Sequence, residues 1–260
     1  MTVSDLIAYA FKTRRAWWYT ATARTRARYA RTRLGSFWLG FSNLLSIAVL
    51  ALVYGTVFRV PDFTEYVLYL GFGLVLWNSL SSALSVAPNL FESQAVLLKN
   101  TSLHPIFYTL EEWAFQVQTF GQSFLLVTLV LAFLKPLILF NFIVFGLFPL
   151  FNFLLALYWI PVLICLLGAQ FRDLYQLVPI LLQLLFLLSP ILYRAESLGR
   201  FAFTADLNFP YLLISLFRDA LLAGHVHPLR FGLLLSINLV GTWSALALLN
   251  RQRRVLPFLV

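Results

Sequence analysis

Long apolar stretches alternate with short polar segments along most of the chain. Six of these stretches are long enough, at about 1.5 Å per residue, to cross a hydrocarbon core of about 30 Å as helices. They cover residues of about 37–58, 65–86, 106–134, 137–168, 174–193 and 229–249. The pattern therefore predicts an all-α membrane protein with six transmembrane helices.

One charged pair marks the end of one span and the start of the next. Arg172 and Asp173 lie between the fourth and fifth apolar stretches. A charge at the centre of a bilayer costs roughly 2.5–3.5 kcal/mol, so we place the pair at a membrane surface. It is either a simple ion pair in the interface or a contact to a cytoplasmic partner.

Residues 1–36 combine aromatic side chains with a run of arginines. This combination predicts an amphipathic helix in the membrane interface, with its arginines near lipid phosphates. The same basic cluster also suits a topogenic signal that keeps this end in the cytoplasm. The sequence thus divides into a cytoplasmic interface helix, 1–36, and a six-span transmembrane domain, 37–260.

The segment 194–228 is the longest connection between two expected spans. It contains an apolar piece, Tyr211–Leu222, that is too short to cross a membrane upright. Non-helical or short helical backbone at membrane depth is tolerated where protein covers it. We therefore expect re-entrant or interfacial helices between the fifth and sixth spans.

The third span is the least uniformly apolar. Glu112, Gln116, Thr119 and Ser123 follow one another at helical spacing and form a polar stripe. Such a stripe avoids lipid. It faces either a neighbouring helix, as a seam of hydrogen bonds, or a water-filled cavity.

Composition excludes a soluble protein, because only 11% of the residues are charged, against about 25% in soluble domains. The net charge of +9 does not indicate a nucleic-acid partner, because the basic residues flank apolar spans, where they set topology. Six of the 19 lysines and arginines fall in expected far-side segments: Arg59, Lys135, Arg194, Arg200, Arg218 and Arg230. The other 13 favour two cytoplasmic termini.

Catalytic motifs are not found. The sequence lacks a Walker A motif, an Asp-x-Asp pair and HExxH, so we expect no catalytic, cofactor-binding or metal-binding residue. His225 and His227 have ligand-like spacing without a third ligand nearby, which favours a solvated loop. A membrane-embedded glycosyl- or acyltransferase remains the alternative from another class, and a scaffolding membrane protein is a third.

Several short elements occur in a recognisable order: RYARTRLGSFWLG at 28–40, Leu98-Lys99-Asn100, FRDLYQLVP at 171–179 and LSPILY at 188–193. Together they resemble the permease subunit of type-2 ABC exporters for bacterial polysaccharides. The resemblance implies a homodimer in the bacterial inner membrane, with two copies of a separate cytoplasmic ATPase that carries ATP and Mg. The substrate would be a lipid-linked polysaccharide, O-antigen first, with capsular polysaccharide or teichoic acid as alternatives.

The resemblance also implies surfaces that couple to the ATPase. We expect these at Arg14, Arg15, Glu92, Gln94, Lys99, Asn100, Arg172 and Asp173. Aromatic faces stack on sugars, although most membrane aromatics are anchors or face lipid. With the polar stripe, the candidate lining of a channel is Trp38, Tyr66, Tyr69, Phe72, Trp77, Glu112, Gln116, Thr119, Ser123 and Tyr193.

Overall fold

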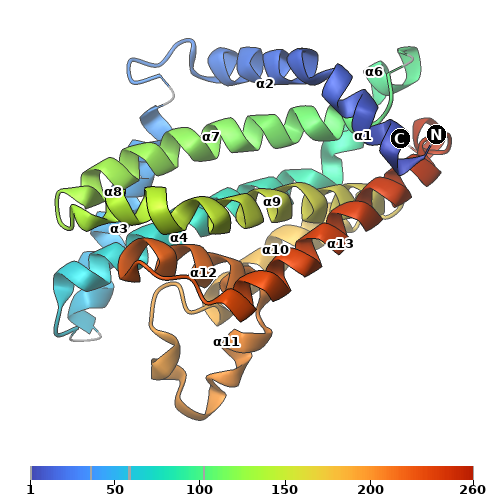
Figure 1. The fold of residues 1–260 in the computed structure, drawn as a ribbon. Helices are drawn as coiled ribbons and strands as arrows, with labels where there is room; N and C mark the ends of the chain where they lie inside the picture. Colours follow the sequence, from blue (N-terminus) through green and yellow to red (C-terminus); the bar gives the residue numbers. More distant parts are fainter. Residues whose placement is uncertain (1, 36, 58–59, 102, 260) are drawn as a thin grey trace.

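The computed structural model describes residues 2–35, 37–57, 60–101 and 103–259. The predicted domain boundary at Ser36, the predicted end of the first span at Phe58, and Arg59 lie outside this part. All regular elements in the described part are helices (Figure 1), which confirms the all-α prediction.

Five helical segments in the described part are long and apolar enough to cross a membrane. They correspond to five of the six predicted spans. The segments are α3 (Phe37–Val57), α4 with its short extension (Phe63–Ser93), α7 (Ile106–Ala132), α8 to α9 (Leu137–Gly168) and α13 (Pro228–Gln252).

The predicted span 174–193 is shorter than expected. Its helix, α10, covers Leu174–Leu188, which is 15 residues or about 22 Å. The helix stops because Ser189 precedes Pro190, and a residue before proline is pushed out of the helical region. Ser189 has an extended backbone with ψ of 134°. The residues up to Tyr193 therefore form a turn after the helix.

The predicted span 137–168 is one helical segment with an irregular turn. It consists of α8 (Leu137–Asn141), a π-helical turn (η2, Phe142–Gly146) and α9 (Leu147–Gly168). The π turn lies just before Pro149, and Pro161 lies inside α9. Proline removes a backbone donor, and a π turn is one way in which a helix absorbs such a disruption.

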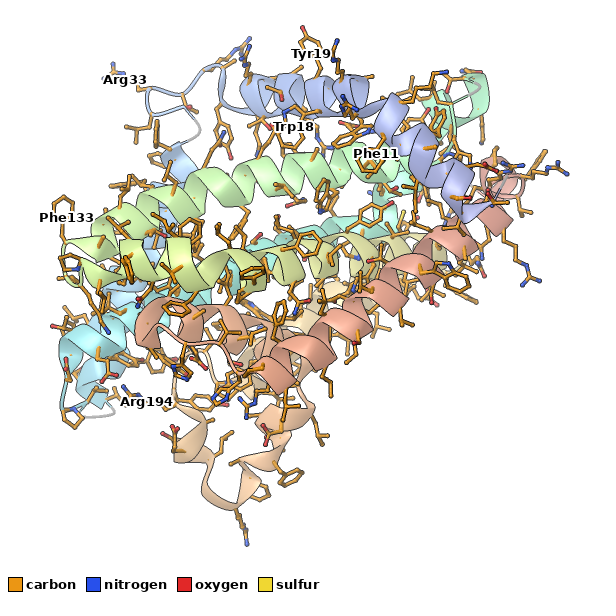
Figure 2. All side chains as sticks on the ribbon, in the orientation of Figure 1. Phe11, Trp18, Tyr19, Arg33, Phe133 and Arg194 are labelled. Carbon is orange, nitrogen blue, oxygen red and sulfur yellow. The ribbon has the colours of Figure 1, made fainter. Side chains whose placement is uncertain are left out.

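The N-terminal region forms two helices, α1 (Val3–Lys12) and α2 (Arg14–Tyr29). A capping box between Thr2 and Asp5 starts α1. Helix α2 runs beside the first half of α7 (Figure 1) and buries Ala21, Thr25 and Tyr29 against it. Exposed aromatic rings, labelled in Figure 2, stand on the uncovered faces of these two helices: Phe11, Trp18 and Tyr19.

The remaining helices are short. They are η1 (Ala87–Asn89), α5 (Leu90–Ser93), α6 (Ala95–Asn100), η3 (Ala195–Phe201), α11 (Phe203–Leu207), α12 (Phe209–Ala223) and α14 (Leu256–Leu259); the main part of α4 is Phe63–Val86. Helices η3, α11 and α12 confirm the prediction of helices between the last two spans. Helix α12 is mostly buried and packs against α4 and α9.

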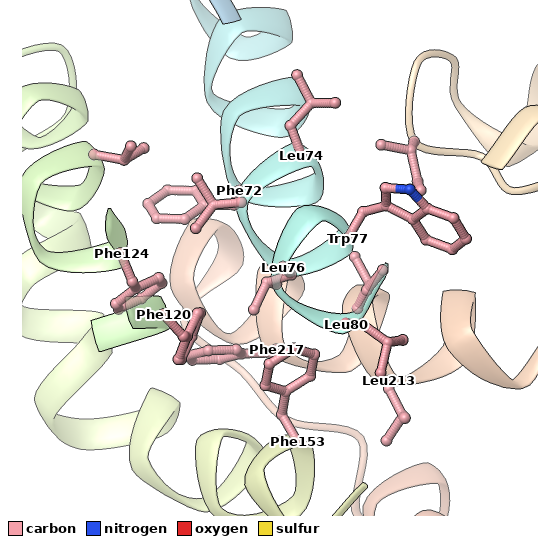
Figure 3. Packing of buried hydrophobic residues seen from close by; sticks show 14 of the residues in the cluster. Phe72, Leu74, Leu76, Trp77, Leu80, Phe120, Phe124, Phe153, Leu213 and Phe217 are labelled. Atoms are coloured by element: carbon pink, nitrogen blue, oxygen red, sulfur yellow. The ribbon is translucent and has the colours of Figure 1, made fainter. Parts of the chain in front are cut away.

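Aromatic rings from four helices build the centre of the core (Figure 3). Phe124 of α7 stacks on Phe217 of α12 with centroids 5.4 Å apart. Phe120 packs between Phe124 and Phe153 of α9, and Phe72 of α4 joins them. Offset aromatic pairs of this kind add about 0.5–1.5 kcal/mol each beyond their buried area. They fix α12 to the transmembrane helices.

The end of α9 lies very close to the turn after α4. A Cβ atom at Gly168 would lie 2.3 Å from the carbonyl oxygen of Pro88 and 2.6 Å from its Cα. Both atoms belong to the backbone, which cannot rotate away. Glycine at 168 therefore allows α9 and η1 to pack directly against each other.

We expect Gly168→Ala to lower the stability of the protein by about 1–3 kcal/mol, the usual cost of overpacking a tight contact. The measurement is the midpoint of thermal unfolding in detergent. Gly121→Ala is the matched control, because a Cβ there meets no atom within 4 Å. Equal midpoints for the two variants would contradict the close contact.

His104 lies in the connection before α7, with its ring 6.0 Å from that of Tyr9 in α1. Its Nδ1 accepts a hydrogen bond from the backbone N–H of Ile106 at 3.2 Å. Burial, with the charge of Arg253, lowers the pKa of His104 from 6.5 to about 4. The imidazole is therefore neutral at pH 7.

Acid should weaken the contact between α1 and the connection before α7, where His104 lies. Between pH 6.5 and about 4 the unfolded chain binds more protons at His104 than the folded chain, so stability falls as the pH is lowered through this window. His104→Asn keeps an acceptor for Ile106 but does not titrate. Between neutral pH and about pH 4.5, the midpoint of thermal unfolding should fall further in the wild type than in this variant. Equal falls would show that His104 does not carry the effect.

Candidate functional site

The polar stripe of α7 is partly closed by hydrogen bonds to α3 and α4. Asn43 of α3 donates through Nδ2 to Ser123 Oγ at 2.6 Å. Asn78 of α4 donates to Asn43 Oδ1 at 2.7 Å. Thr119 donates to a carbonyl of its own helix, that of Phe115, at 3.0 Å. The stripe is thus a hydrogen-bonded seam, as one of the two alternatives predicted.

A second chain of hydrogen bonds begins on α2. Arg24 donates through Nη1 to Glu112 Oε2 at 2.6 Å, and Gln116 donates to Glu112 Oε1 at 2.8 Å. Ser82 of α4 donates to Gln116 Oε1 at 3.3 Å. The chain links the basic helix α2, through α7, to the polar side of α4.

A recess of about 150 Å³ opens where α3, α4 and α7 meet. The stripe residues Gln116, Thr119 and Ser123 line it. The other lining residues are Leu39, Ser42, Asn43, Val75, Asn78, Ser79, Ser82 and Phe120. The polar groups are amides and hydroxyls without net charge, so the recess both donates and accepts hydrogen bonds. The second alternative, a water-filled cavity, stays a prediction for this face of α7.

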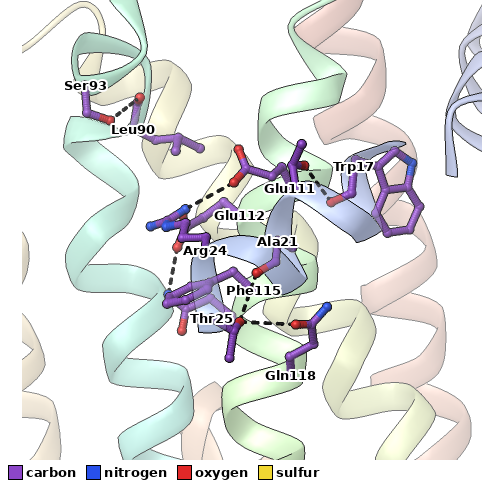
Figure 4. A network of polar contacts seen from close by, with 12 residues as sticks. Trp17, Ala21, Arg24, Thr25, Leu90, Ser93, Glu111, Glu112, Phe115 and Gln118 are labelled. Carbon is purple, nitrogen blue, oxygen red and sulfur yellow. Dashed lines mark hydrogen bonds and ion pairs between the residues drawn. The ribbon is translucent and has the colours of Figure 1, made fainter. Parts of the chain in front are cut away.

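Arg24 is the centre of the contact between α2 and α7 (Figure 4). Its Nη1 lies 2.6 Å from Glu112 and 3.7 Å from Glu111, and its guanidinium lies 4.2 Å above the ring of Phe115. Thr25 donates to Gln118 Oε1 at 3.1 Å. Arg24 was not among the predicted site residues. The available signal was Glu111-Glu112, two acids inside an apolar span that need a cation from another segment.

Four predicted channel aromatics are buried inside the chain: Tyr66, Tyr69, Phe72 and Trp77. The hydroxyl of Tyr66 donates to the carbonyl of Leu192 at 2.6 Å, and that of Tyr69 donates to Pro190 at 2.8 Å. The hydroxyls of these two tyrosines hold the turn after α10 against α4.

The two other aromatic candidates are more accessible: Tyr193 is half-buried and Trp38 is exposed. A channel-lining role stays a prediction for all six aromatic residues.

Two of the predicted coupling residues, Glu92 and Arg172, lie together at one end of the bundle, where α5 meets the start of α10. Glu92 of α5 accepts a hydrogen bond from the hydroxyl of Tyr175 at 2.5 Å and forms an ion pair with Arg172 at 3.4 Å. The Arg172 side chain is 77% exposed, so the ion pair itself contributes only about 0–1 kcal/mol. Its partner is Glu92 rather than the neighbouring Asp173.

The other predicted coupling residues are placed on the same end without forming a single cluster. Gln94 is half-buried between α5 and α6. Exposed members of the set are Arg14 and Arg15 at the start of α2, Lys99 and Asn100 at the end of α6, and Asp173 before α10. Their role in coupling stays a prediction.

The rings of His225 and His227 lie 5.2 Å apart. Within the residues that the structure describes, no three His, Cys, Asp or Glu side chains group as metal ligands do.

We expect Arg24→Gln to destabilise the protein by about 1.5–3 kcal/mol, because it leaves the buried carboxylate of Glu112 without its charged donor. The double variant Arg24→Gln with Glu112→Gln should recover part of this loss. Arg26→Gln is the control, because Arg26 is exposed on the other side of α2. Thermal unfolding in detergent measures all three, and equal effects of the single changes at 24 and 26 would contradict the pairing.

A comparison with known protein families matches residues 18–222 to the family described as ABC-2 type transporter. No curated protein matches the chain. The matched region covers more than half of the 260 residues and includes the recess, the α2–α7 contact and the Glu92–Arg172 pair. Members of this family are membrane components of ABC transporters and pair with an ATPase subunit. The chain therefore belongs to the ABC-2 type transporter family, as a multi-pass membrane permease.

Proposed function

We propose that this permease exports a lipid-linked polysaccharide, O-antigen first, across the bacterial inner membrane. Two copies of the chain form a homodimer that binds two cytoplasmic ATPase subunits. Both termini face the cytoplasm. ATP and Mg are bound by the ATPase, and the permease supplies the path and the coupling surface.

The recess between α3, α4 and α7 is the observation that carries this proposal. Its wall combines amides and hydroxyls with the apolar side chains of Leu39, Val75 and Phe120. Sugar rings present hydroxyls that donate and accept hydrogen bonds, together with apolar C–H faces. Neutral polar groups can bind such rings and release them again, because no ion pair has to be broken.

The coupling surface is proposed at the end of the bundle that carries both termini (Figure 1). There Glu92 joins the helix after α4 to α10, through Tyr175 and Arg172. Gly168 packs α9 against the same region at Pro88. A partner that moves α5 therefore acts on α4, α9 and α10 together.

Capsular polysaccharide and teichoic acid remain alternative substrates, since both also carry hydroxyl groups that the amides and hydroxyls of the recess can bind. A transferase is less well supported. Glu111 and Glu112, the acids that it would need, both lie within 3.7 Å of Arg24. A carboxylate held in an ion pair is a poor general base.

The first test is co-expression with a candidate ATPase subunit, sought among the genes next to that of this chain, followed by purification from membranes in a detergent without sugar. We expect a complex with two copies of each subunit, whose ATP hydrolysis is stimulated by lipid-linked polysaccharide. Purification of the permease alone, or a complex whose ATP hydrolysis the polymer does not change, would contradict the proposal.

The second test fills the recess. Ser82→Leu places an isobutyl group in it, and export of labelled polymer into inverted vesicles should fall by about tenfold, equivalent to about 1.4 kcal/mol of barrier. Ser236→Leu is the control, because Ser236 is exposed on α13 and donates to its own helix at 2.8 Å. Unchanged export in Ser82→Leu would remove the recess from the path.

A further inference from the structure

A second polar cavity lies at the opposite end of the bundle from the termini. It has a volume of about 480 Å³, within the range of small-molecule sites. Its wall comes from the start of α4, from η3 and α11, and from α12 and the start of α13. A neighbouring cavity of about 370 Å³ shares Glu65 and Arg194 with it (Arg194 is labelled in Figure 2).

Ion pairs with both partners on the wall dominate the larger cavity. Arg194 lies 2.9 Å from Glu65 of α4, and Arg230 of α13 lies 3.7 Å from a carboxylate oxygen of α11. A third pair joins two neighbours on α12. The acidic partners in these three pairs are Glu65, Asp206 and Asp219, and Glu196 adds a fourth carboxylate to the wall.

Arg218 is the unusual member of this wall, because only 2% of it is exposed. Its guanidinium stacks on the ring of Tyr69 at 3.6 Å. One nitrogen, Nη1, donates to the carbonyl of Pro190 at a long 3.5 Å, and Nε has no hydrogen-bond partner among the described residues. Nε lies 3.6 Å from the carboxylate of Asp219, within ion-pair range only.

A buried guanidinium is costly unless its donors are used. Nε of Arg218 is closed to solvent, so the donors that a bound molecule with oxygen acceptors would meet on this wall are those of Arg194 and Arg230, whose side chains are 47% and 55% exposed. The charges on the cavity wall limit which chemical class of molecule can bind there. Three arginines and four carboxylates line the cavity. An anion would be repelled by the four carboxylates. Each of the three arginines is already paired with one of them, so none is free to attract an anion.

A neutral polyol fits both kinds of group. Its hydroxyls accept from guanidinium donors and donate to carboxylates, and Tyr69 and Tyr211 supply aromatic edges at the same wall. We propose that this cavity is a saccharide-binding site, which holds a neutral sugar unit at the end of the permease opposite the coupling surface. The choice of a sugar from the transported polymer rests on the proposed function.

The test measures binding by the purified permease alone, in nanodiscs and without sugar detergent. Saturation-transfer NMR would use the methyl glycosides of glucose, galactose, mannose, rhamnose and N-acetylglucosamine as probes. We expect transfer to at least one glycoside. The double variant Asp206→Asn with Arg230→Gln should weaken its affinity by about tenfold. Both residues are exposed, so the fold is retained.

Arg200→Gln is the matched control, because Arg200 is exposed beside Phe201 and lies outside the cavity wall. Transfer to none of the glycosides, or transfer that the double variant leaves unchanged, would overturn the proposal. Displacement of the glycoside by inorganic phosphate would also overturn it, since that result indicates an anion site.

The assay needs neither ATPase nor transport. Binding without export would contradict the proposed function only, and export without binding would contradict this site only.

Discussion

A carboxylate inside an apolar helix bundle has to be paired, and Glu112 is where this constraint acts most strongly. Its side chain is buried in α7, and Arg24 and Gln116 occupy its two oxygens. The pairing requires a cation at that depth, which explains why a helix as basic as α2 packs beside a membrane helix. Ala21 and Thr25 let the two backbones approach closely enough for the pair to form.

The same stripe changes character along its length. Near α2 the stripe is charged and closed. At its other end Ser123 is neutral and bonded to Asn43 of α3, which in turn accepts from Asn78 of α4, and this end lines the partly open recess. Paired charges hold two helices firmly together, whereas accessible neutral polar groups leave room for a ligand. Glu112 and Gln116 join the two parts, so α7 both holds α2 and forms the wall of the recess.

Five of the six expected apolar stretches coincide with helical segments that are long and apolar enough to span a membrane, because length and hydropathy are local properties. The apolar pattern overestimated α10, where Pro190 ends the helix early. The aromatic candidates on α4 were chosen by residue type, and type does not tell which face of a helix meets protein. Arg218 shows the same limit: counted as a far-side charge, it is one of the most buried side chains in the described chain. Partners distant in sequence, such as Arg24 and Glu112, leave no local pattern.

The distance between those two partners along the chain also sets an order of assembly. Arg24 is synthesised 88 residues before Glu112. At about 5–20 residues per second, the ribosome takes about 4–18 s to cover that gap. Throughout this interval Arg24 lacks its partner in α7, and water or lipid phosphate can solvate its charge while α3 and α4 are synthesised. The contact between α2 and α7 can therefore form only after α7 has been synthesised.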